Sequence, residues 1–347
     1  MTFTIGRGNE LCVSGIRSLA AQLIGQDVAV LMQQPVEMSR RMTSDSQLRW
    51  VGPEKGVIHL AAAAVINAVW DLWAKIQQKP VWQLVADMPP EQFASCVDFR
   101  YLTDEINSSQ AIELLTTAAV GKNDRLQILL DKGYPSYTTS AGWLGYSDEQ
   151  LKQKCADLKQ RGWNHFKIKV GRDLDDDRRR CGLLRSEMGE FNPWFVEEPT
   201  SPDDILGHAA IAKAVNPIRI ATGEMCHNRI MFKQFLQADA MQVCQLDSCR
   251  LGGVNEVLAV LLLAEKFKVP VCPHAGGVGL CEYVQHLSMI DYLCVSGTTE
   301  DRVTEYSDHL HEHVIHPVIM ENGHYQAPKD AGYSVQFTEA AKNGFAC

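Results

Sequence analysis

The sequence predicts an α/β protein: a modified TIM-type (β/α) barrel with one β/α unit missing, plus an α+β capping domain truncated at its N-terminus. From Tyr134 onward, short apolar runs alternate with amphipathic helical stretches, as in parallel strands joined by crossover helices. The first third of the chain has helical periodicity instead, which indicates a second unit. We expect the capping domain at residues 1–132, the barrel at 133–310, and a segment at 311–347 that returns to the capping domain.

The first third is expected to be mainly helical. Glu10–Gln26 carries apolar residues at helical spacing, and Leu60–Ile76 combines many alanines with large apolar side chains on the same period. Ser95–Tyr101 predicts a short strand.

The barrel elements follow in chain order. Strands are predicted at Tyr137–Leu144, His165–Val170, Trp194–Val196, Arg219–Thr222, Met241–Leu246, Pro270–Cys272 and Tyr292–Val295. The helices predicted between them include Asp148–Arg161, Leu174–Met188, Asp203–Ala214, Asn228–Ala238 and Gly253–Phe267. In such barrels the chemistry lies at the carboxyl ends of the strands, so functional residues are expected there.

Composition restricts the class of partner. The net charge is -9 with no long basic run, which argues against nucleic acid or an anionic membrane as the main partner. The eleven cysteines are scattered without paired C-x-x-C spacing, which favours free thiols in a reducing compartment. The longest apolar run, Val257–Ala264, is too short to cross a bilayer, and residues 1–10 have no secretory signal. We therefore expect a soluble protein that binds a small molecule.

Five consecutive predicted strand ends carry an acidic residue or a histidine. One acidic residue after a strand is often a helix N-cap, and that explanation stays open for each position alone. It explains five in succession poorly. The positions are Glu197, Glu224, Asp247, His274 and the segment Glu300–Glu305.

Two lysines precede this series. Lys167 and Lys169 lie two residues apart on one predicted strand, so they point to the same side, although two surface lysines would give the same pattern. Carboxylates on neighbouring strands suit Mg²⁺, which prefers oxygen ligands. A lysine on one side and a histidine on the other suit proton transfer across a bound substrate. Together these groups fit proton abstraction next to a carboxylate.

Several sequence motifs indicate a particular enzyme family. The Lys-Ile-Lys run at 167–169 and the Val-Glu-Glu-Pro turn at 196–199 resemble the mandelate racemase branch of the enolase superfamily. Further strings are similar to the L-fuconate dehydratases of that branch, and the resemblance covers nearly the whole chain. They are Arg49–Gly56, Ala68–Lys75, Tyr137–Ser140 and Glu305–His313.

The resemblance implies a reaction and a role for each group. Lys169 would take the proton from C2 of the sugar acid, and His274, held by Asp247, would protonate the departing C3 hydroxyl. Glu305 would hydrogen-bond the enolate oxygen opposite a metal ion. The enol would become 2-keto-3-deoxy-L-fuconate. Lys167 and Trp50 would contact the substrate, as would His274 and Glu305.

The resemblance also implies a Mg²⁺ site and shows where this chain departs from it. Glu197 and Glu224 would bind the metal, but the strand expected to supply a third ligand, an Asp, is missing. Only residues 171–193 lie between the lysine strand and the Glu-Glu-Pro strand, with the joint around 189–192. A barrel with one unit fewer must change its tilt or leave a gap. Nearby Asp173 and Asp175–Asp177 are expected to form the charged first turn of a helix, not a replacement ligand site.

Three interpretations of function stay open. The chain is a Mg²⁺-dependent acid-sugar dehydratase acting on L-fuconate, a catalytically impaired isoform, or a racemase or cycloisomerase of the same superfamily. The resemblance further implies a mitochondrial location, with the cytoplasm as the alternative, and association into homo-oligomers.

Overall fold

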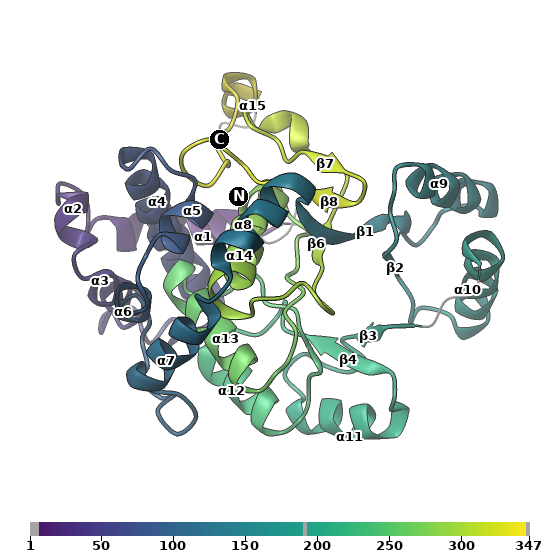
Figure 1. Cartoon of the computed structure of the whole chain (residues 1–347), viewed down its shortest axis with the longest axis horizontal. Coiled ribbons are helices and arrows are strands. Elements are labelled where there is room, and N and C mark those ends of the chain that lie inside the picture. The colour runs from purple at the N-terminus through teal and green to yellow at the C-terminus, as the bar shows by residue number, and fades with distance from the viewer. Residues whose placement is uncertain (1–6, 190–192, 345–347) are drawn as a thin grey trace.

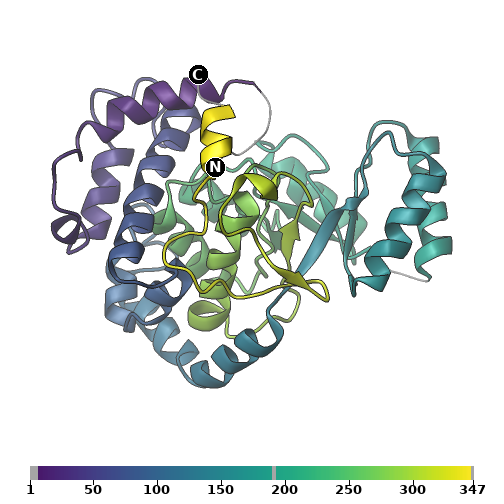
Figure 2. The ribbon, with the colours of Figure 1, turned by 90° about the horizontal axis from the view of Figure 1, so that it is seen from above.

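The computed structural model describes residues 7–189 and 193–344. Predictions that concern residues 1–6, and the joint around 190–192, lie outside these ranges. The N-terminal helices wrap one side of the molecule, the strands lie near its middle, and a pair of helices projects on the other side (Figures 1 and 2).

The first third of the described chain is helical. The predicted strand Ser95–Tyr101 is wrong: this segment is the end of one helix followed by turns, and its Asp98 and Arg100 pair with side chains instead of forming a strand. The helices are α1 (Asn9–Ala20), α2 (Val28–Leu31), α3 (Pro35–Thr43), α4 (Gly56–Ile76), α5 (Val81–Ala86), α6 (Pro90–Ser95), α7 (Ser108–Ala118) and α8 (Lys122–Lys132).

Helix α4 is the central helix of this part. By length and composition alone it could cross a membrane, but half of its apolar window is buried inside the protein. It packs against α1 and α13 (Val254–Lys266), and the fully buried Trp70 donates its indole N–H to Asn255 Oδ1 at 2.9 Å. These contacts are those of a core helix in a globular domain.

The strands form a parallel barrel that is open at one place. Strands β6, β1 and β2 pair in one sheet, and β3, β4 and β5 in another. The extended segment 270–274 joins the two: Val271 bridges to Cys244, and Pro273 accepts a hydrogen bond from the Glu305 N–H at 3.1 Å. The strands are β1 (Tyr134–Gly142), β2 (Phe166–Ile168), β3 (Phe195–Glu197), β4 (Arg219–Thr222), β5 (Val243–Cys244) and β6 (Thr304–Tyr306).

The crossover helices agree with the sequence predictions to within about two residues. The predicted strand Tyr292–Val295 is wrong, because this buried run continues the preceding helix as a π-helical turn. A short apolar run cannot by itself distinguish a strand from a buried helix. The last barrel strand is β6, so Glu305 lies within a strand. The helices are α9 (Asp148–Gln160), α10 (Leu174–Met188), α11 (Ile205–Val215), α12 (Arg229–Gln237), α13 and α14 (Leu280–Ile290).

The expected gap lies between β2 and β3. Among the described residues, no backbone pairing joins these two strands. All residues of β2 and β3 are only partly buried, whereas those of β5 and β6 are fully buried. Helices α9 and α10, with β2, project as an arm on the far side of this gap (Figure 1). The missing β/α unit therefore leaves an opening, and the barrel does not close around it.

The C-terminal segment returns to the N-terminal helices. Strands β7 (Met320–Glu321) and β8 (His324–Tyr325) form a hairpin that pairs antiparallel with the start of β1. Beyond it, the Pro328 carbonyl accepts a hydrogen bond from Trp82 Nε1 at 2.9 Å, before the chain ends in α15 (Glu339–Gly344). The domain boundaries themselves stay a prediction.

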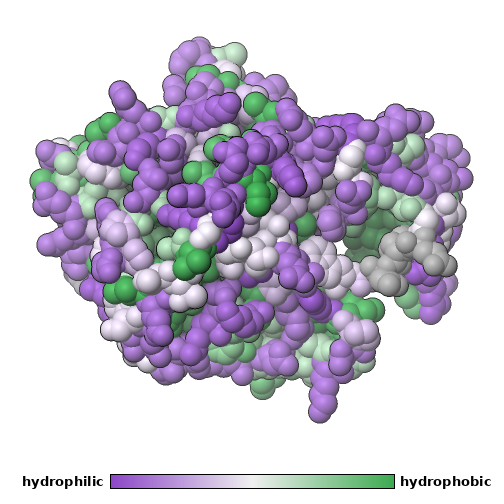
Figure 3. Space-filling view, in the orientation of Figure 1, coloured by the Kyte–Doolittle hydropathy of each residue, from purple (hydrophilic) through white to green (hydrophobic). Residues whose placement is uncertain are grey.

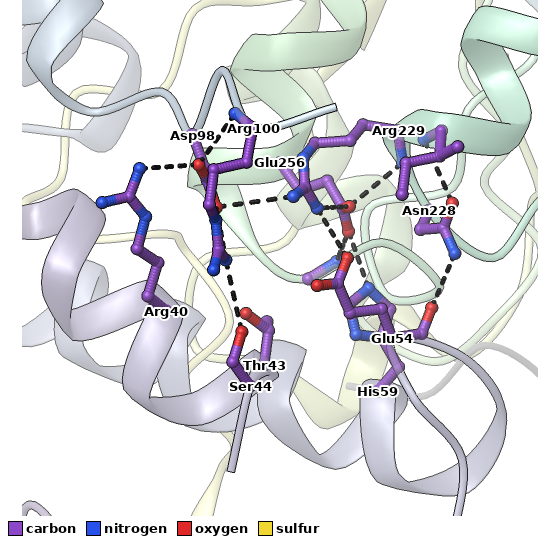
Figure 4. Close-up of polar contacts among 12 residues, drawn as sticks. Arg40, Thr43, Ser44, Glu54, His59, Asp98, Arg100, Asn228, Arg229 and Glu256 are labelled. Carbon is purple, nitrogen blue, oxygen red and sulfur yellow. Dashed lines mark hydrogen bonds and ion pairs between the residues drawn. The ribbon is translucent and has the colours of Figure 1, made fainter. Parts of the chain in front are cut away.

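A buried ion network centred on Arg229 fixes the N-terminal helices to the barrel (Figure 4). Arg229 begins α12, and only 3% of the residue is exposed. Its Nη1 lies 2.8 Å from Glu54 and 3.0 Å from Glu256, and its Nη2 lies 3.4 Å from Asp98. Glu256 also contacts His59 at 2.7 Å. The network thus connects the turn before α4, the segment after α6, and helices α12 and α13.

Acid is expected to weaken this network. Burial raises the pKa of Glu256, but His59 and Arg229 outweigh burial and lower this pKa to about 2. Burial also raises the pKa of Asp98, but Arg40 and Arg100 outweigh burial and lower this pKa to about 2. Because both pKa values are lower in the folded state than in the unfolded state, the two carboxylates stabilise the fold above about pH 4.5. This stability is lost as the pH falls toward 2. Urea unfolding from pH 6 to pH 2 should show a loss on the order of 2 kcal/mol or more. A flat profile would contradict this expectation.

Candidate active site

The open barrel brings most of the predicted site residues together at the carboxyl ends of its strands. Lys167 lies in β2, Glu197 ends β3, and Glu305 lies in β6. Glu224 follows β4, and Asp247 follows β5 by a few residues. His274 ends the extended segment 270–274, which lies beside β5.

Lys167 is the cation at the centre of the cluster. Its Nζ lies 2.5 Å from Glu197 Oε1 and 3.5 Å from Glu305 Oε1. Burial disfavours the ammonium ion, but Glu305 and Glu197 outweigh burial and raise the pKa of Lys167. Glu305 also accepts the Ala275 N–H at 2.9 Å. Burial raises the pKa of Glu305, yet Lys167 and His274 lower it to about 2. This side of the site is an ionised carboxylate–ammonium cluster.

His274 and Asp247 form a buried dyad on the other side. His274 Nδ1 lies 2.7 Å from Asp247 Oδ2, and Asp247 Oδ1 accepts the backbone N–H groups of Cys249 and Arg250. Burial opposes the charged imidazolium, but Glu305 and Asp247 outweigh it and raise the pKa of His274 to about 9. The imidazole is therefore protonated near neutral pH, and its Nε2 lies 3.6 Å from Glu224 Oε2 and 3.8 Å from Glu305 Oε2.

The carboxyl group of Glu224 has a raised pKa, unlike that of Glu305. Its Oε2 lies 3.6 Å from His274 Nε2. Burial raises its pKa to about 7; His274 opposes this shift and Glu197 adds to it. Gly223, before it, has φ +138°, and a Cβ there would lie 3.0 Å from the backbone of Gln245. Only glycine fits this position, so Gly223 determines how Glu224 enters the site.

Some neighbours of the site were not singled out in the sequence. Gln245 donates to Glu197 Oε2 at 3.0 Å and to the Tyr137 hydroxyl at 3.3 Å. Gln245 lies two residues before Asp247 in a predicted strand, so strand alternation could have identified it. Glu198 belongs to the Val-Glu-Glu-Pro turn at 196–199, but the sequence predicts no role for it; it is held at φ +44° with one buried carboxylate oxygen unpartnered, a conformation that the sequence does not signal.

Two predicted residues lie apart from this cluster. Lys169 Nζ lies 5.9 Å from the centre of the Trp143 ring, yet Lys169 is close enough to contribute to the low pKa of Glu305. Its backbone carbonyl is held by Arg180 at 2.7 Å. The structure does not bring Trp50 into the cluster, because its side chain is 85% exposed on the connection between α3 and α4.

The residues present do not complete a Mg²⁺ site. Glu197 is already bonded to Lys167 and Gln245, and Glu224 faces His274. Within residues 7–189 and 193–344, no group of three or more His, Cys, Asp or Glu side chains is arranged so that it could hold a metal ion. Asp173 caps α10, and Asp175–Asp177 form its first turn, as predicted. Two carboxylates therefore remain for a cation that needs more oxygen ligands.

Weak metal binding follows from this donor set. At 1 mM Mg²⁺, a dissociation constant of 1 mM or higher would stabilise the fold by at most about 0.4 kcal/mol. We therefore expect thermal unfolding to shift by about 1 °C or less on adding 1 mM Mg²⁺. Ca²⁺ at the same concentration is the control for nonspecific ionic effects. A shift specific to Mg²⁺ and worth more than about 2 kcal/mol would mean that another group completes the site.

Fold and site together define an enolase-type α/β enzyme scaffold. Residues 2–86 match the "Mandelate racemase / muconate lactonizing enzyme, N-terminal domain" model, and residues 186–341 match "Enolase C-terminal domain-like". The chain is 53% identical to mitochondrial enolase superfamily member 1 of Xenopus laevis, over 98% of this chain and 82% of the relative. It is 50% identical to L-galactonate dehydratase of Hypocrea jecorina, over 97% and 81%.

Solved structures agree. The structure of human mitochondrial enolase superfamily member 1 matches with a TM-score of 0.95 and 49% identity, covering 99% of this chain and 87% of that one. L-talarate dehydratase of Polaromonas sp. JS666, complexed with Mg and L-glucarate, shares the fold at a TM-score of 0.70 and 20% identity, over 97% and 85%. The chain belongs to the mandelate racemase branch of the enolase superfamily, and its named dehydratase relatives make it an enzyme of the hydro-lyase type.

The relatives are longer than this chain inside the matched region. The alignment with the Xenopus relative spans 367 positions, whereas 98% of 347 residues is about 340, so about 27 positions have no counterpart here. This is close to one β/α unit, roughly 30 residues in a barrel of typical size. In size, the shortfall therefore matches the strand and helix that are missing at the opening between β2 and β3.

Proposed function

We propose that this chain is an acid-sugar dehydratase that removes water across C2 and C3 of a six-carbon L-galacto aldonate. L-fuconate is the substrate that the family resemblance implies, and L-galactonate is named for a relative at 50% identity. L-fuconate is 6-deoxy-L-galactonate, so the two differ only at C6, three bonds from C3. A site built for one can admit the other without changing the reacting groups.

The observation that supports this chemistry best is the His274–Asp247 dyad facing the Lys167 cluster. Lys169 would remove the C2 proton, and Lys167 would bind the substrate carboxylate. His274 would pass its proton to the C3 hydroxyl, which leaves as water. The resulting enol becomes the 2-keto-3-deoxy acid. Asp247 holds the imidazole and stabilises its charge, as a carboxylate partner does for a general-acid histidine.

Mg²⁺ is the cofactor that the resemblance implies, and Glu197 and Glu224 would be its ligands from this chain. Because they do not complete a site, a second candidate function is a catalytically impaired form of the dehydratase. The opening between β2 and β3 favours this candidate. The names of relatives at 50% identity or more favour dehydration over racemisation.

Turnover distinguishes the two candidates. The purified chain would be incubated with L-fuconate and with L-galactonate, with and without Mg²⁺, and the 2-keto-3-deoxy product measured. Product formation that requires Lys169 supports the dehydratase. Folded protein that forms no product supports the impaired form. A mitochondrial location and homo-oligomers belong to the same proposal, and cell fractionation and sedimentation would test them.

A further inference from the structure

The opening between β2 and β3 has the properties of an incomplete binding surface. Parallel strands in a barrel are normally covered on both faces and paired on both edges. Here each of β2 and β3 has one paired neighbour, β1 and β4 respectively, and their residues stay partly exposed. Side-chain contacts between described residues span the opening, among them Lys167 with Glu197, and the His165 ring with the Trp194 ring at 5.5 Å. Within residues 7–189 and 193–344, the facing backbone edges of β2 and β3 thus lack a partner strand.

In the described part of the chain, the layer of helices outside the strands also lacks a covering element at the opening. Helix α11 is apolar, yet of its residues only His208 is fully buried. His208 packs edge-on against Phe235 of α12, with ring centres 5.3 Å apart. At 100° per residue, Leu206 and Ala210 lie on the face opposite His208, away from α12, and Lys213 lies in line with Leu206 at the last turn of the same exposed face. Leu206 is 77% exposed there. The uncovered face of α11 is the one that a helix between α10 and α11 would cover.

We propose that the opening binds a strand–helix segment of another polypeptide, which adds a parallel strand between β2 and β3 and a helix between α10 and α11. The direction follows from β2 and β3, which both belong to parallel ladders. The size follows from the relatives, which carry about 27 positions that have no counterpart in this chain. Figure 3 shows hydrophobic side chains in the hollow between the arm and the body of the molecule.

A bound strand–helix segment would cover both the unpaired edges of β2 and β3 and the exposed face of α11. An added strand gives hydrogen-bond partners to two open edges, as in β-strand addition. Its helix covers the first two turns of the exposed face of α11, where Leu206 and Ala210 lie, and leaves Lys213 at the last turn in solvent. A second copy of this chain pairing edge to edge would satisfy the strands but would leave α11 uncovered.

The test uses the full chain and a synthetic peptide. The peptide is the stretch of the human relative that aligns with no residue here, fluorescently labelled, with a scrambled version as control. Binding is measured by anisotropy, and hydrogen exchange is followed in residues 166–168, 195–197 and 205–215. We expect specific binding with slower exchange in all three segments. Leu206→Lys should weaken binding about tenfold or more, because it places a charge on the covered face.

Val120→Lys is the matched control, because Val120 is 78% exposed and follows α7, outside the opening. Both variants alter exposed side chains, so both should fold, which circular dichroism checks. Absence of binding, or binding that Leu206→Lys leaves unchanged, overturns the proposal. So does a dimer that protects β2 and β3 and excludes the peptide. Because the readout is binding, the outcome is independent of whether the chain turns over a sugar acid.

Discussion

Replacing Arg229 with methionine is expected to destabilise the protein by about 3–5 kcal/mol, the typical cost of removing one partner from a buried ion pair. Methionine keeps much of the volume of the side chain but none of its donors. Glu54, Glu256 and Asp98 would then remain buried without the cation that now lies 2.8–3.4 Å from them. Because the network joins helices α3 and α4 to α12 and α13, the loss should weaken the contact between the N-terminal helices and the barrel.

Urea denaturation at pH 7 measures the effect, and Arg178→Met is the matched control. Arg178 pairs with Asp175 on α10, where both side chains are largely exposed, so its loss should change stability little. The difference between wild type and Arg229→Met should shrink between pH 7 and pH 3, because protonated carboxyl groups no longer need the guanidinium. A difference that stays constant with pH would assign the loss to packing and not to charge.

Much of the barrel could be predicted because its signals are local. The alternation of apolar runs with amphipathic stretches gave the crossover helices, and the shortage of residues between Ile168 and Phe195 predicted the opening that the structure shows. The grouping of Lys167, Glu197, Glu224, Asp247, His274 and Glu305 also followed, since the carboxyl ends of parallel strands meet at one end of a barrel.

The remaining features depend on tertiary contacts. The run 292–295 is apolar enough for a strand, but it continues a buried helix, and only packing decides between the two. Asp98 and Arg100 lie in a predicted strand, yet they bind the Arg229 network or its neighbours. The exposure of Trp50 depends on how the connection after α3 lies on the body. A partner more than 100 residues away along the chain leaves no periodic signal in the segment that it binds.

Exchange of the C2 proton with solvent should separate the roles of Lys169 and His274. In deuterated water, Lys169→Ala is expected to lose both deuterium incorporation at C2 and water elimination, by about 10²–10⁴-fold, the usual contribution of a general base. His274→Asn should lose elimination by a similar factor while deuterium still enters C2, because the base remains and only the acid at C3 is lost. Mass spectrometry of recovered substrate, with assay of the keto acid, measures both steps.

Lys169 and His274 are expected to have separate roles because they lie on different sides of the site. His274 is held by Asp247 at 2.7 Å, whereas Lys169 lies beyond Lys167 on the arm that carries β2. Asp247→Asn keeps the shape of the partner but removes its charge, so it should slow elimination more than exchange. His316→Asn, on a side chain that is 47% exposed, should change neither rate. Elimination at the wild-type rate in His274→Asn would exclude this histidine as the acid, and exchange that survives in Lys169→Ala would move the base to another residue.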